Sequence, residues 1–351
     1  MRVAVTGGAG FIGHHLVAEM IAMGADATEP VVVLDNLRRA KRETLAPWIE
    51  MGAVRFIEGD VRDAATVTDA LRGADVVFHL AAQANVMGSE GDPNYAFTTN
   101  VTGTHTVLQA AAEVGVRRVL LASSREVYGQ PDALPVPETA RLAPRNVYGA
   151  SKAAGEMLAR AAAGRGGLEV VALRLANVYG PGDSERVLPL WLNRAARGKE
   201  LVIYGGKQVL DLVWVGDVVE AFLRAAGAPI AAFERTGAGT VQQESSGFFA
   251  ALNVGTGQGT SIHTLAERVR ATTGRDVPIR VAPARAAEVE QYVADVTLLR
   301  DTLNLVPAAP LAHLPVMGRQ AVAAICCYPV EFSNGHGMAY ISAGERTRAR
   351  G

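Results

Sequence analysis

Cysteine is almost absent from the 351-residue sequence, since only Cys326 and Cys327 occur and they are adjacent. Two neighbouring cysteines cannot form a disulfide framework, and this usage fits a reducing cytosol. Apolar runs of about 18 residues, long enough to span a bilayer, are also lacking. The opening segment, MRVAVTGGAGFIG, is broken by glycines and has neither the charged region nor the cleavage site of a secretory signal. We therefore expect a cytoplasmic protein with no membrane partner.

An excess of either charge is lacking too, because 34 Lys and Arg residues are balanced by 35 Asp and Glu residues. A net charge of -1 gives no broad positive field that would attract nucleic acid, so we expect no nucleic-acid partner. The composition, 49% hydrophobic and 20% charged, is typical of a globular protein. An anionic ligand would have to be held by local groups.

Short β-branched and apolar runs alternate with helical stretches through the first half of the chain. Continuous apolar strands separated by helices predict a parallel sheet that is covered on both faces. The predicted fold class is therefore α/β, a Rossmann-type doubly wound parallel sheet. The predicted strands lie in RVAVT (2–6), VVVLD (31–35), VRFIEGD (54–60), DVVFHLAA (75–82), RRVLLASS (117–124) and LEVVALRLA (168–176).

Beyond about residue 177 the pattern is less regular, and glycine-rich turns separate shorter elements. We predict a dinucleotide-binding domain at 1–176 and a smaller C-terminal α/β substrate lobe at 177–313. Within this lobe, 227–248 has the composition of a loop and is predicted to project as an insertion. The segment 314–351 follows no period and is predicted to be an ill-ordered tail.

A glycine-rich loop, TGGAGFIG, follows the first strand directly and precedes the helical stretch HHLVAEMIAMG. Glycines allow a tight turn and a close approach of the backbone, and the N-terminus of a helix offers N–H groups to phosphate. Strand, loop and helix in this order predict a dinucleotide site, with a purely structural turn as the alternative. The residues predicted to hold the pyrophosphate are Gly7, Gly10, Phe11, Ile12 and Gly13.

Asp35 ends the second predicted strand about twenty residues further on and is followed by Asn36. A carboxylate at this place accepts the ribose hydroxyls of NAD and repels the 2′-phosphate of NADP, so the predicted cofactor is NAD. Arg38 and Arg39 leave NADP as an alternative, because arginines here can grip that phosphate. Asp60, after the third strand, is predicted to reach the adenine amino group, with a plain turn aspartate as the alternative.

Tyr148 and Lys152 stand four residues apart in PRNVYGASK, a spacing that places two side chains on one face of a helix. The pKa of a tyrosine hydroxyl is about 10, too high for a general base, and a fixed positive charge lowers it. The pair is therefore either a tyrosine base activated by an ammonium group or an ordinary surface pair. The spacing alone does not decide between them.

A series of motifs covers about residues 1 to 310, and their order is highly specific. They are VTGGAGFIG, LDNL, GDVRD, HLAA (79–82), NVTGT (100–104), SSREVYG (123–129), YGASK (148–152), RLANVYGPG (174–182) and LNVGTG (252–257). Together they resemble the extended short-chain dehydrogenase/reductases, and within them the NAD-dependent sugar epimerase/dehydratase group that includes the UDP-glucose 4-epimerases.

The resemblance implies that Tyr148 takes the proton from a sugar hydroxyl while hydride passes from that carbon to NAD. Lys152 would hold the nicotinamide ribose and lower the pKa of the tyrosine, and Ser124 would hydrogen-bond the same oxygen. Such enzymes keep NAD bound and return the hydride, so the sugar is oxidised only transiently, usually at C4. The further residues that match the cofactor channel are Val61, Leu80, Ala81, Ala82 and Asn100.

The fate of the keto sugar separates the members of this group, and Glu126 bears on it. A glutamate at this place is carried by 4,6-dehydratases and uronate decarboxylases, where it can remove the proton at C5. The aspartate that would act as the acid in a dehydratase is Arg125 here, and arginine does not deprotonate in proteins. Arg125 would bind the carboxylate of a uronic acid or form a salt bridge with Glu126. We expect a 4-epimerase, with a 4,6-dehydratase or UDP-glucuronate decarboxylase as the alternative.

The resemblance also implies a nucleotide-diphosphate sugar as substrate. Asn177 would contact the diphosphate, Tyr204 would line the base pocket, and Arg285 would clamp the phosphates or the ribose. Many relatives carry an arginine where this chain has Leu210, so one charge-assisted contact to the diphosphate is lost. Lys207 or Arg186 would replace it.

Two other classes are less consistent with the sequence. A reductase of the steroid or flavonoid type shares the first half of the fold, but Asp35 and Asn177 argue against it. A non-catalytic dinucleotide-binding regulator commonly lacks the tyrosine or the lysine, and both are present here. No metal site is predicted. Relatives pair the amphipathic stretches corresponding to 100–114 and 148–163 across a two-fold axis, so we expect a homodimer.

Overall fold

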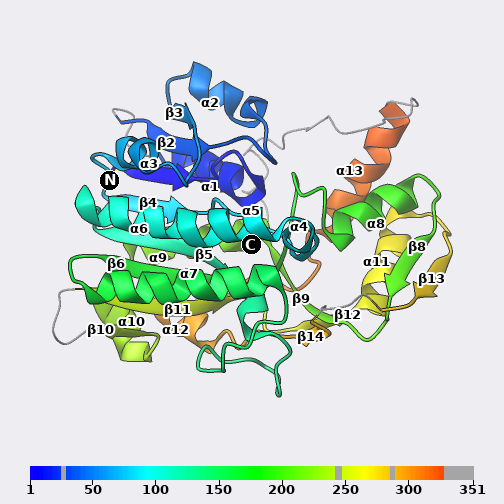
Figure 1. Cartoon of the computed structure of the whole chain (residues 1–351). Coiled ribbons are helices and arrows are strands. Elements are labelled where there is room, and N and C mark those ends of the chain that lie inside the picture. The colour runs from blue at the N-terminus through cyan, green and yellow to red at the C-terminus, as the bar shows by residue number, and fades with distance from the viewer. Residues whose placement is uncertain (25–28, 242–246, 285–288, 328–351) are drawn as a thin grey trace.

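The computed structural model describes residues 1–24, 29–241, 247–284 and 289–327. An eight-stranded sheet forms the centre of the larger part of the molecule (Figure 1). Its strand order is β10-β11-β6-β5-β4-β1-β2-β3, and the pairs are parallel apart from β10 with β11. The strands are β1 (Val3–Thr6), β2 (Val31–Asp35), β3 (Val54–Glu58), β4 (Val76–His79), β5 (Arg118–Ser124), β6 (Glu169–Leu175), β10 (Gly239–Val241) and β11 (Phe248–Val254). The Rossmann-type prediction is confirmed.

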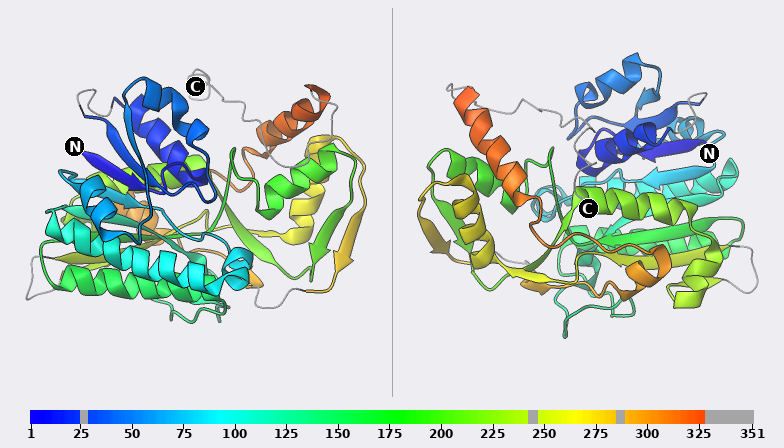
Figure 2. Two further views of the ribbon diagram at one scale, coloured as in Figure 1. Left: turned by 45° about the horizontal axis from the view of Figure 1, so that its top comes forward. Right: turned by 180° about the vertical axis from the view of Figure 1, so that it is seen from behind.

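Helices cover both faces of this sheet. Helices α3 (Ala64–Leu71), α6 (Gly103–Glu113) and α7 (Val147–Gly164) lie on the face toward the viewer in Figure 1. Helices α1 (Phe11–Ala22) and α9 (Val215–Gly227) cover the other face, as Figure 2 shows from behind. Each helix buries one apolar stripe: α6 buries Val107, Leu108 and Ala111, and α1 buries Leu16 and Val17. The two resulting cores leave the carboxyl ends of the strands free to carry a site.

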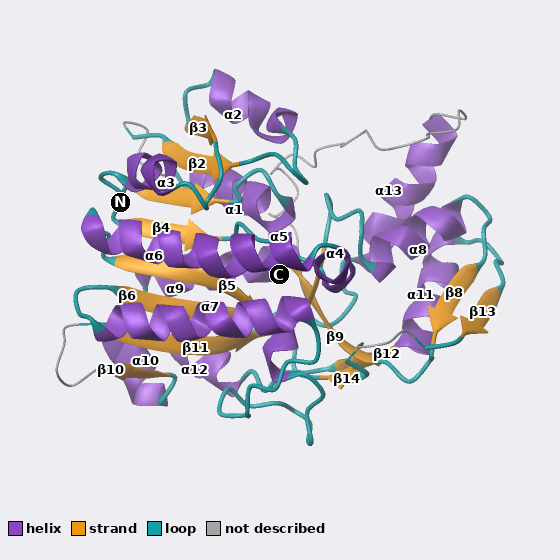
Figure 3. Ribbon diagram, viewed as in Figure 1, coloured by secondary structure: helices purple, strands orange, loops and turns teal. Residues whose placement is uncertain are grey.

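A smaller lobe, at the right in Figure 3, is built on two short sheets. Strand β9 (Val209–Trp214) pairs with β7 (Asn177–Tyr179), β12 (Gly259–Ser261) and β14 (Gln291–Tyr292), while β8 (Leu201–Tyr204) pairs with β13 (Ile279–Ala282). Helices α8 (Val187–Ala196), α11 (Ile262–Thr273) and α13 (Leu314–Cys327) enclose a core that contains Trp191, Leu265 and Met317. The remaining helices are α2 (Ala46–Glu50), α4 (Val86–Gly91), α5 (Pro93–Phe97), α10 (Ile230–Thr236) and α12 (Thr297–Leu303), with 3-10 turns η1 (Arg42–Leu45) and η3 (Arg125–Tyr128) and the π-helical turn η2 (Thr98–Thr102).

The prediction of a projecting loop at 227–248 was wrong for the described part of that segment. Helix α10 begins at Ile230, and strand β10 pairs antiparallel with β11 at the edge of the large sheet. Alanine, glycine and threonine dominate this stretch and gave no apolar period. The burial of Ala232 and Phe233 against neighbouring elements, rather than local propensity, accounts for the helix.

The large sheet also takes residues from beyond the predicted boundary at 176. Strand β11 lies parallel to β6, and α9 packs on α1, so the chain returns from the smaller lobe to complete the larger part. The predicted tail was likewise wrong for 314–327, where α13 buries Leu314 and Met317 in the core of the smaller lobe. Residues 328–351 lie outside the described part.

Candidate active site

The loop between β1 and α1 is shaped by glycines that leave no room for side chains. Gly7 has φ +74°, and a Cβ there would lie 2.6 Å from the backbone nitrogen of Ala81. A Cβ at Gly13 would lie 2.2 Å from the carbonyl oxygen of Gly7. Gly10, at the N-cap of α1, has no side chain to occupy the first N–H groups of the helix. This cradle fits the pyrophosphate of a dinucleotide, and Phe11 and Ile12 line the same cavity.

Asp35 joins the end of β2 to the glycine loop. Its carboxylate accepts hydrogen bonds from the backbone N–H of Ala9 (3.1 Å) and of Leu37 (2.9 Å). Burial raises the pKa of Asp35, and these two hydrogen bonds oppose the rise. The carboxylate therefore lies beside the loop, where the sequence predicts the ribose of NAD.

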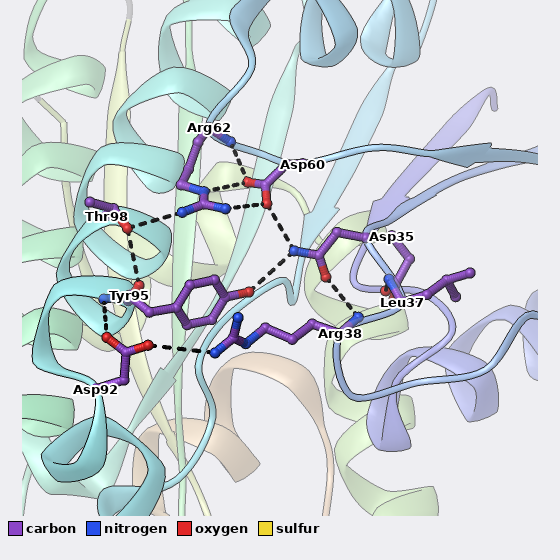
Figure 4. Close-up of polar contacts among 9 residues, drawn as sticks. Asp35, Leu37, Arg38, Asp60, Arg62, Asp92, Tyr95 and Thr98 are labelled. Atoms are coloured by element: carbon purple, nitrogen blue, oxygen red, sulfur yellow. Dashed lines mark hydrogen bonds and ion pairs between the residues drawn. The ribbon is translucent and has the colours of Figure 1, made fainter.

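The arginines that could have gripped a 2′-phosphate have other partners. Arg38 stacks 3.8 Å from the ring centroid of Tyr95 and lies 3.5 Å from Asp92, as Figure 4 shows. Arg39 forms an ion pair with Glu185. The alternative of NADP therefore gains no support from either side chain.

Asp60 belongs to the same polar cluster (Figure 4) and is engaged by protein groups. Arg62 donates to both of its oxygens at 2.8 Å, and the Asn36 amide donates to one of them at 2.9 Å. The Arg62 contact lowers the pKa of Asp60 to about 2. Contact with adenine stays a prediction for Asp60, as does cofactor contact for its neighbour Val61.

The end of β4 forms the next wall of the cavity, through Leu80, Ala81 and Ala82. Asn100, from the turn before α6, is buried behind it rather than exposed to the cavity. Its side-chain oxygen accepts from the backbone N–H of Gln83 (2.8 Å), and its amide donates to Ser151 on α7 (2.9 Å). Asn100 thus ties the β4 loop to α7, which gives it a positioning role in the site.

Tyr148, Lys152 and Ser124 meet where β5 ends against the first turns of α7. The Lys152 ammonium donates to the carbonyl oxygen of Ala122 at 2.8 Å and lies 5.9 Å from the centroid of the Tyr148 ring. Asn146 caps the helix, because its side-chain oxygen accepts from the N–H of Gly149 at 2.8 Å. All three predicted residues line one cavity with the glycine loop.

The pKa of Tyr148 moves against the expectation from the sequence. Partial burial raises it, and this effect outweighs the opposing hydrogen bond with Ser124 and the charge of Arg186. Burial also lowers the pKa of Lys152 to about 8, so the ammonium itself is less firmly charged than in water. A predicted net lowering of the tyrosine pKa by Lys152 is therefore not what this geometry gives.

Both carboxylate oxygens of Glu126 are occupied. Arg125 lies 2.8 Å from one oxygen, and the amide of Asn146 donates to the other at 2.8 Å. Of the two partners expected for Arg125, the structure realises the salt bridge, with Arg125 also 5.8 Å from the ring centroid of Tyr292. Through Asn146, Glu126 supports the cap of the helix that carries Tyr148.

The cavity has a volume of about 760 Å³ and continues from the cofactor side to the smaller lobe. Asn177 and Tyr204 line it, and the Asn177 amide donates to the carbonyl oxygen of Asp211 at 3.1 Å. Leu210 lines it too, as does Arg186, whose nearest acid is Asp183 at 3.3 Å. Replacement of the absent arginine by Arg186 stays a prediction that its place in the cavity supports, whereas Lys207 is not among the described lining residues. Arg285 lies outside the described residues.

Glu185, Arg194 and Glu156 are among the residues at or near the site that were missed from the sequence. Glu185 and Arg194 line the cavity from loop and helix positions without a motif, so no local signal could have found them. Glu156 is buried behind Lys152, and the continued spacing of four residues along α7 was a usable signal.

Among the described residues, every helix is too short or too polar to cross a membrane. No group of three or more histidine, cysteine and acidic side chains in the same part of the chain is arranged to hold a metal ion.

Residues 3–235 match the sequence profile of the NAD dependent epimerase/dehydratase family. A UDP-glucose 4-epimerase of Lacticaseibacillus casei is 33% identical over 327 residues, which cover 88% of this chain and 92% of that protein. The solved UDP-glucose 4-epimerase of Thermotoga maritima with UDP-glucose is 31% identical, with a TM-score of 0.81 over 93% of this chain and 100% of that one. A dTDP-glucose 4,6-dehydratase of Streptomyces venezuelae with NAD is 32% identical, with a TM-score of 0.80 over 93% and 99%. The likeness extends to both reaction types.

Proposed function

The chain belongs to the NAD-dependent epimerase/dehydratase family and its cofactor is NAD, and on this basis we propose that it is a nucleotide-sugar 4-epimerase. The observation that carries the proposal is the meeting of Tyr148, Lys152 and Ser124 at the end of β5, in the cavity that the glycine loop also lines. A tyrosine base, a cation and a hydroxyl donor are the groups that oxidation of a secondary alcohol requires.

In the proposed reaction, Tyr148 removes the proton of the C4 hydroxyl, and Ser124 hydrogen-bonds the same oxygen. Bound NAD supplies the acceptor for the hydride of that carbon, and later the donor that returns it. The Lys152 ammonium, which is buried and fixed by the Ala122 carbonyl, stabilises the negative charge on the tyrosine oxygen. The keto sugar turns its other face toward the cofactor before the hydride is returned. Tyr148 then returns the proton to the C4 oxygen, which gives the C4 epimer.

The surroundings of Glu126 favour epimerisation over elimination. A base for the C5 proton needs a carboxylate oxygen that can approach the sugar, and the two oxygens of Glu126 are engaged by Arg125 in an ion pair and by the Asn146 amide in a hydrogen bond. The neighbouring position, where a dehydratase needs an acid, holds Arg125, which cannot donate a proton to a leaving hydroxyl. Glu126 in this proposal holds Asn146 and Arg125 in place and does not touch C5.

A single product analysis tests the proposal. The purified protein with NAD is incubated separately with UDP-glucose, UDP-galactose, dTDP-glucose, GDP-mannose and UDP-glucuronate. The products are separated by chromatography, and their masses are measured by mass spectrometry. We expect an isomer of unchanged mass with at least one of them, and no isomer with the Tyr148→Phe variant. Loss of water or of carbon dioxide would instead assign the protein to the dehydratase or decarboxylase branch.

We further propose that the protein is a homodimer built on α6 and α7, the helices of the two amphipathic stretches, together with the adjoining α5. Helix α7 contacts both α5 and α6, helices α6 and α7 lie in front of the sheet in Figure 1, and Phe97 (58%) on α5 and Met157 (62%) on α7 are exposed. Light scattering of the purified protein is expected to give twice the mass of the chain, and the double variant Phe97→Glu, Met157→Glu to give a single mass. A monomeric wild-type protein would contradict this proposal without affecting the assigned reaction.

A further inference from the structure

The last three residues of β5 each hold one residue of α7. The carbonyl oxygen of Ala122 accepts from Lys152 at 2.8 Å, and the Ser124 hydroxyl bonds Tyr148. Between them, the Ser123 hydroxyl donates to the carboxylate of Glu156. The three helix positions are spaced by four residues and therefore share one face. Strand and helix are thus linked at three successive points, and Glu156 is the one of the three helix residues that the sequence did not single out.

Glu156 is almost fully enclosed, with 3% of its surface exposed. Arg174 on β6 donates to its carboxylate from Nη2 at 2.7 Å and from Nε at 3.0 Å. Arg174 is itself fixed by the Tyr128 hydroxyl at 2.8 Å and by the carbonyl oxygen of Glu138 at 2.9 Å. Such a buried pair gains little stability over apolar side chains of the same size, because both charges lose their water. A role in positioning accounts for it better than stability does.

The charges around Lys152 give Glu156 a second effect. Burial lowers the pKa of Lys152 to about 8, and the negative charge of Glu156 raises it. His79 on β4 also faces Lys152 and stays neutral, because burial lowers its pKa to about 3. Tyr148 is the remaining titratable neighbour on α7, and Arg174 lies on the far side of Glu156. Glu156 is therefore the acidic group that opposes loss of the Lys152 proton.

We propose that Glu156 is a positioning residue for the reaction: it fixes α7 against the end of β5 and keeps Lys152 positively charged beside Tyr148. The proposal rests on the proposed function for the roles of Tyr148 and Lys152. Glu156 reaches the reacting atoms only through Lys152, so its removal changes the pH at which Lys152 loses its proton rather than which product forms.

The test is the variant Glu156→Gln in the full chain with NAD. Glutamine keeps an oxygen for Ser123 but removes the charge. We expect the alkaline limb of the kcat profile, which loss of the Lys152 proton sets, to move down by about one pH unit, the size of effect that a nearby charge has on a buried group. The ¹³C NMR signal of the lysine ε-carbon, assigned with a Lys152→Met background, is expected to show Lys152 losing its proton at a lower pH. Glu156→Asp, which keeps the charge, is expected to restore the wild-type profile.

Glu169→Gln is the matched control, because Glu169 forms a comparable ion pair with buried Arg118 (2.6 Å) at the opposite end of β5 and β6. It is expected to lower the melting temperature and leave the pH profile unchanged. If Glu156→Gln behaves in the same way, with an unchanged profile and an unchanged Lys152 titration, Glu156 is only structural and the proposal is overturned. If the wild-type protein turns over no nucleotide sugar, the proposed function fails, while the Lys152 titration still decides the role of Glu156.

Discussion

Arg39, in the loop after β2, forms an ion pair with Glu185, in the loop between β7 and α8. The amide of Asn85 donates a second hydrogen bond to the same Glu185 oxygen, at 2.7 Å. All three residues line the cavity, so Glu185 connects the cofactor side to the substrate side across it. Under the proposed function the cofactor must stay bound through the reaction, so we expect this connection to help retain NAD.

Removing the Glu185 carboxylate is expected to loosen NAD. The pair is partly exposed, so the loss of about 0.2–1 kcal/mol typical of surface ion pairs corresponds to a dissociation rate only a few-fold faster. The measurement is the fraction of NAD retained by Glu185→Ala after gel filtration at low and high salt. Glu267→Gln, which breaks the exposed pair with Arg270 on α11, is the control. Equal retention by the two variants would show that the connection does not hold the cofactor.

Gly13→Ala is expected to abolish NAD binding. The added Cβ would stand 2.2 Å from the carbonyl oxygen of Gly7, so the loop between β1 and α1 must move and lose the shape that receives the pyrophosphate. Gly227→Ala, at the end of α9, is the control, because a Cβ there meets nothing within 4 Å. Calorimetric titration with NAD distinguishes them, and unimpaired binding by Gly13→Ala would refute the assignment of this loop.

Glu126→Gln is expected to lower the turnover rate while leaving the product an isomer of unchanged mass. Arg125 would lose its ionic partner, so unfolding is also expected to become easier by about 1–3 kcal/mol. Mass spectrometry of the product and urea denaturation measure the two effects. A variant that accumulates the keto sugar, from a wild-type protein that releases water or carbon dioxide, would instead make Glu126 the second base.

Stability is expected to fall as the pH drops below 6.5. Burial lowers the pKa of His79 in the folded protein from 6.5 to about 3, so between these values the unfolded chain binds a proton that the folded chain does not. This histidine therefore destabilises the fold progressively as the pH falls through that window, by at most about 1.4 kcal/mol per pH unit. Urea denaturation at several pH values should show a smaller slope for His79→Gln. The exposed His105 on α6 is the control, and an equal loss of slope on its replacement would contradict the assignment to His79.

The strands of the first half and the glycine loop could be predicted because their signals are local. A buried parallel strand needs a continuous apolar run, and the phosphate loop needs glycines where Cβ atoms would collide. The edge strand β10 and helix α13 could not be predicted in this way. Residues 227–248 and 314–327 carry no clear period, and their elements exist because they pack against β11 and against α8 and α11.

The same distinction between local signals and tertiary contacts applies to the candidate site. The spacing of Tyr148 and Lys152 indicated a shared helix face, but it could not give the pKa of either group, which depends on burial. The sequence left Arg125 with two possible partners, and Arg38 and Arg39 with a possible contact to a 2′-phosphate. In the folded chain Arg125 pairs with Glu126, Arg38 with Asp92 and Tyr95, and Arg39 with Glu185. No short motif defines these contacts between side chains.

The sequence by itself determined the six strands of the first half, the dinucleotide loop, the order of the motifs and the chemical groups that the reaction needs. These depend on steric limits and periodicities within a few neighbouring residues. Only the tertiary structure decided that Glu156 is buried near Lys152, that both oxygens of Glu126 contact protein groups, and that Glu185 crosses the cavity to Arg39. Each of these depends on burial and on the distance between charges from separate elements, quantities that exist only once the chain has folded.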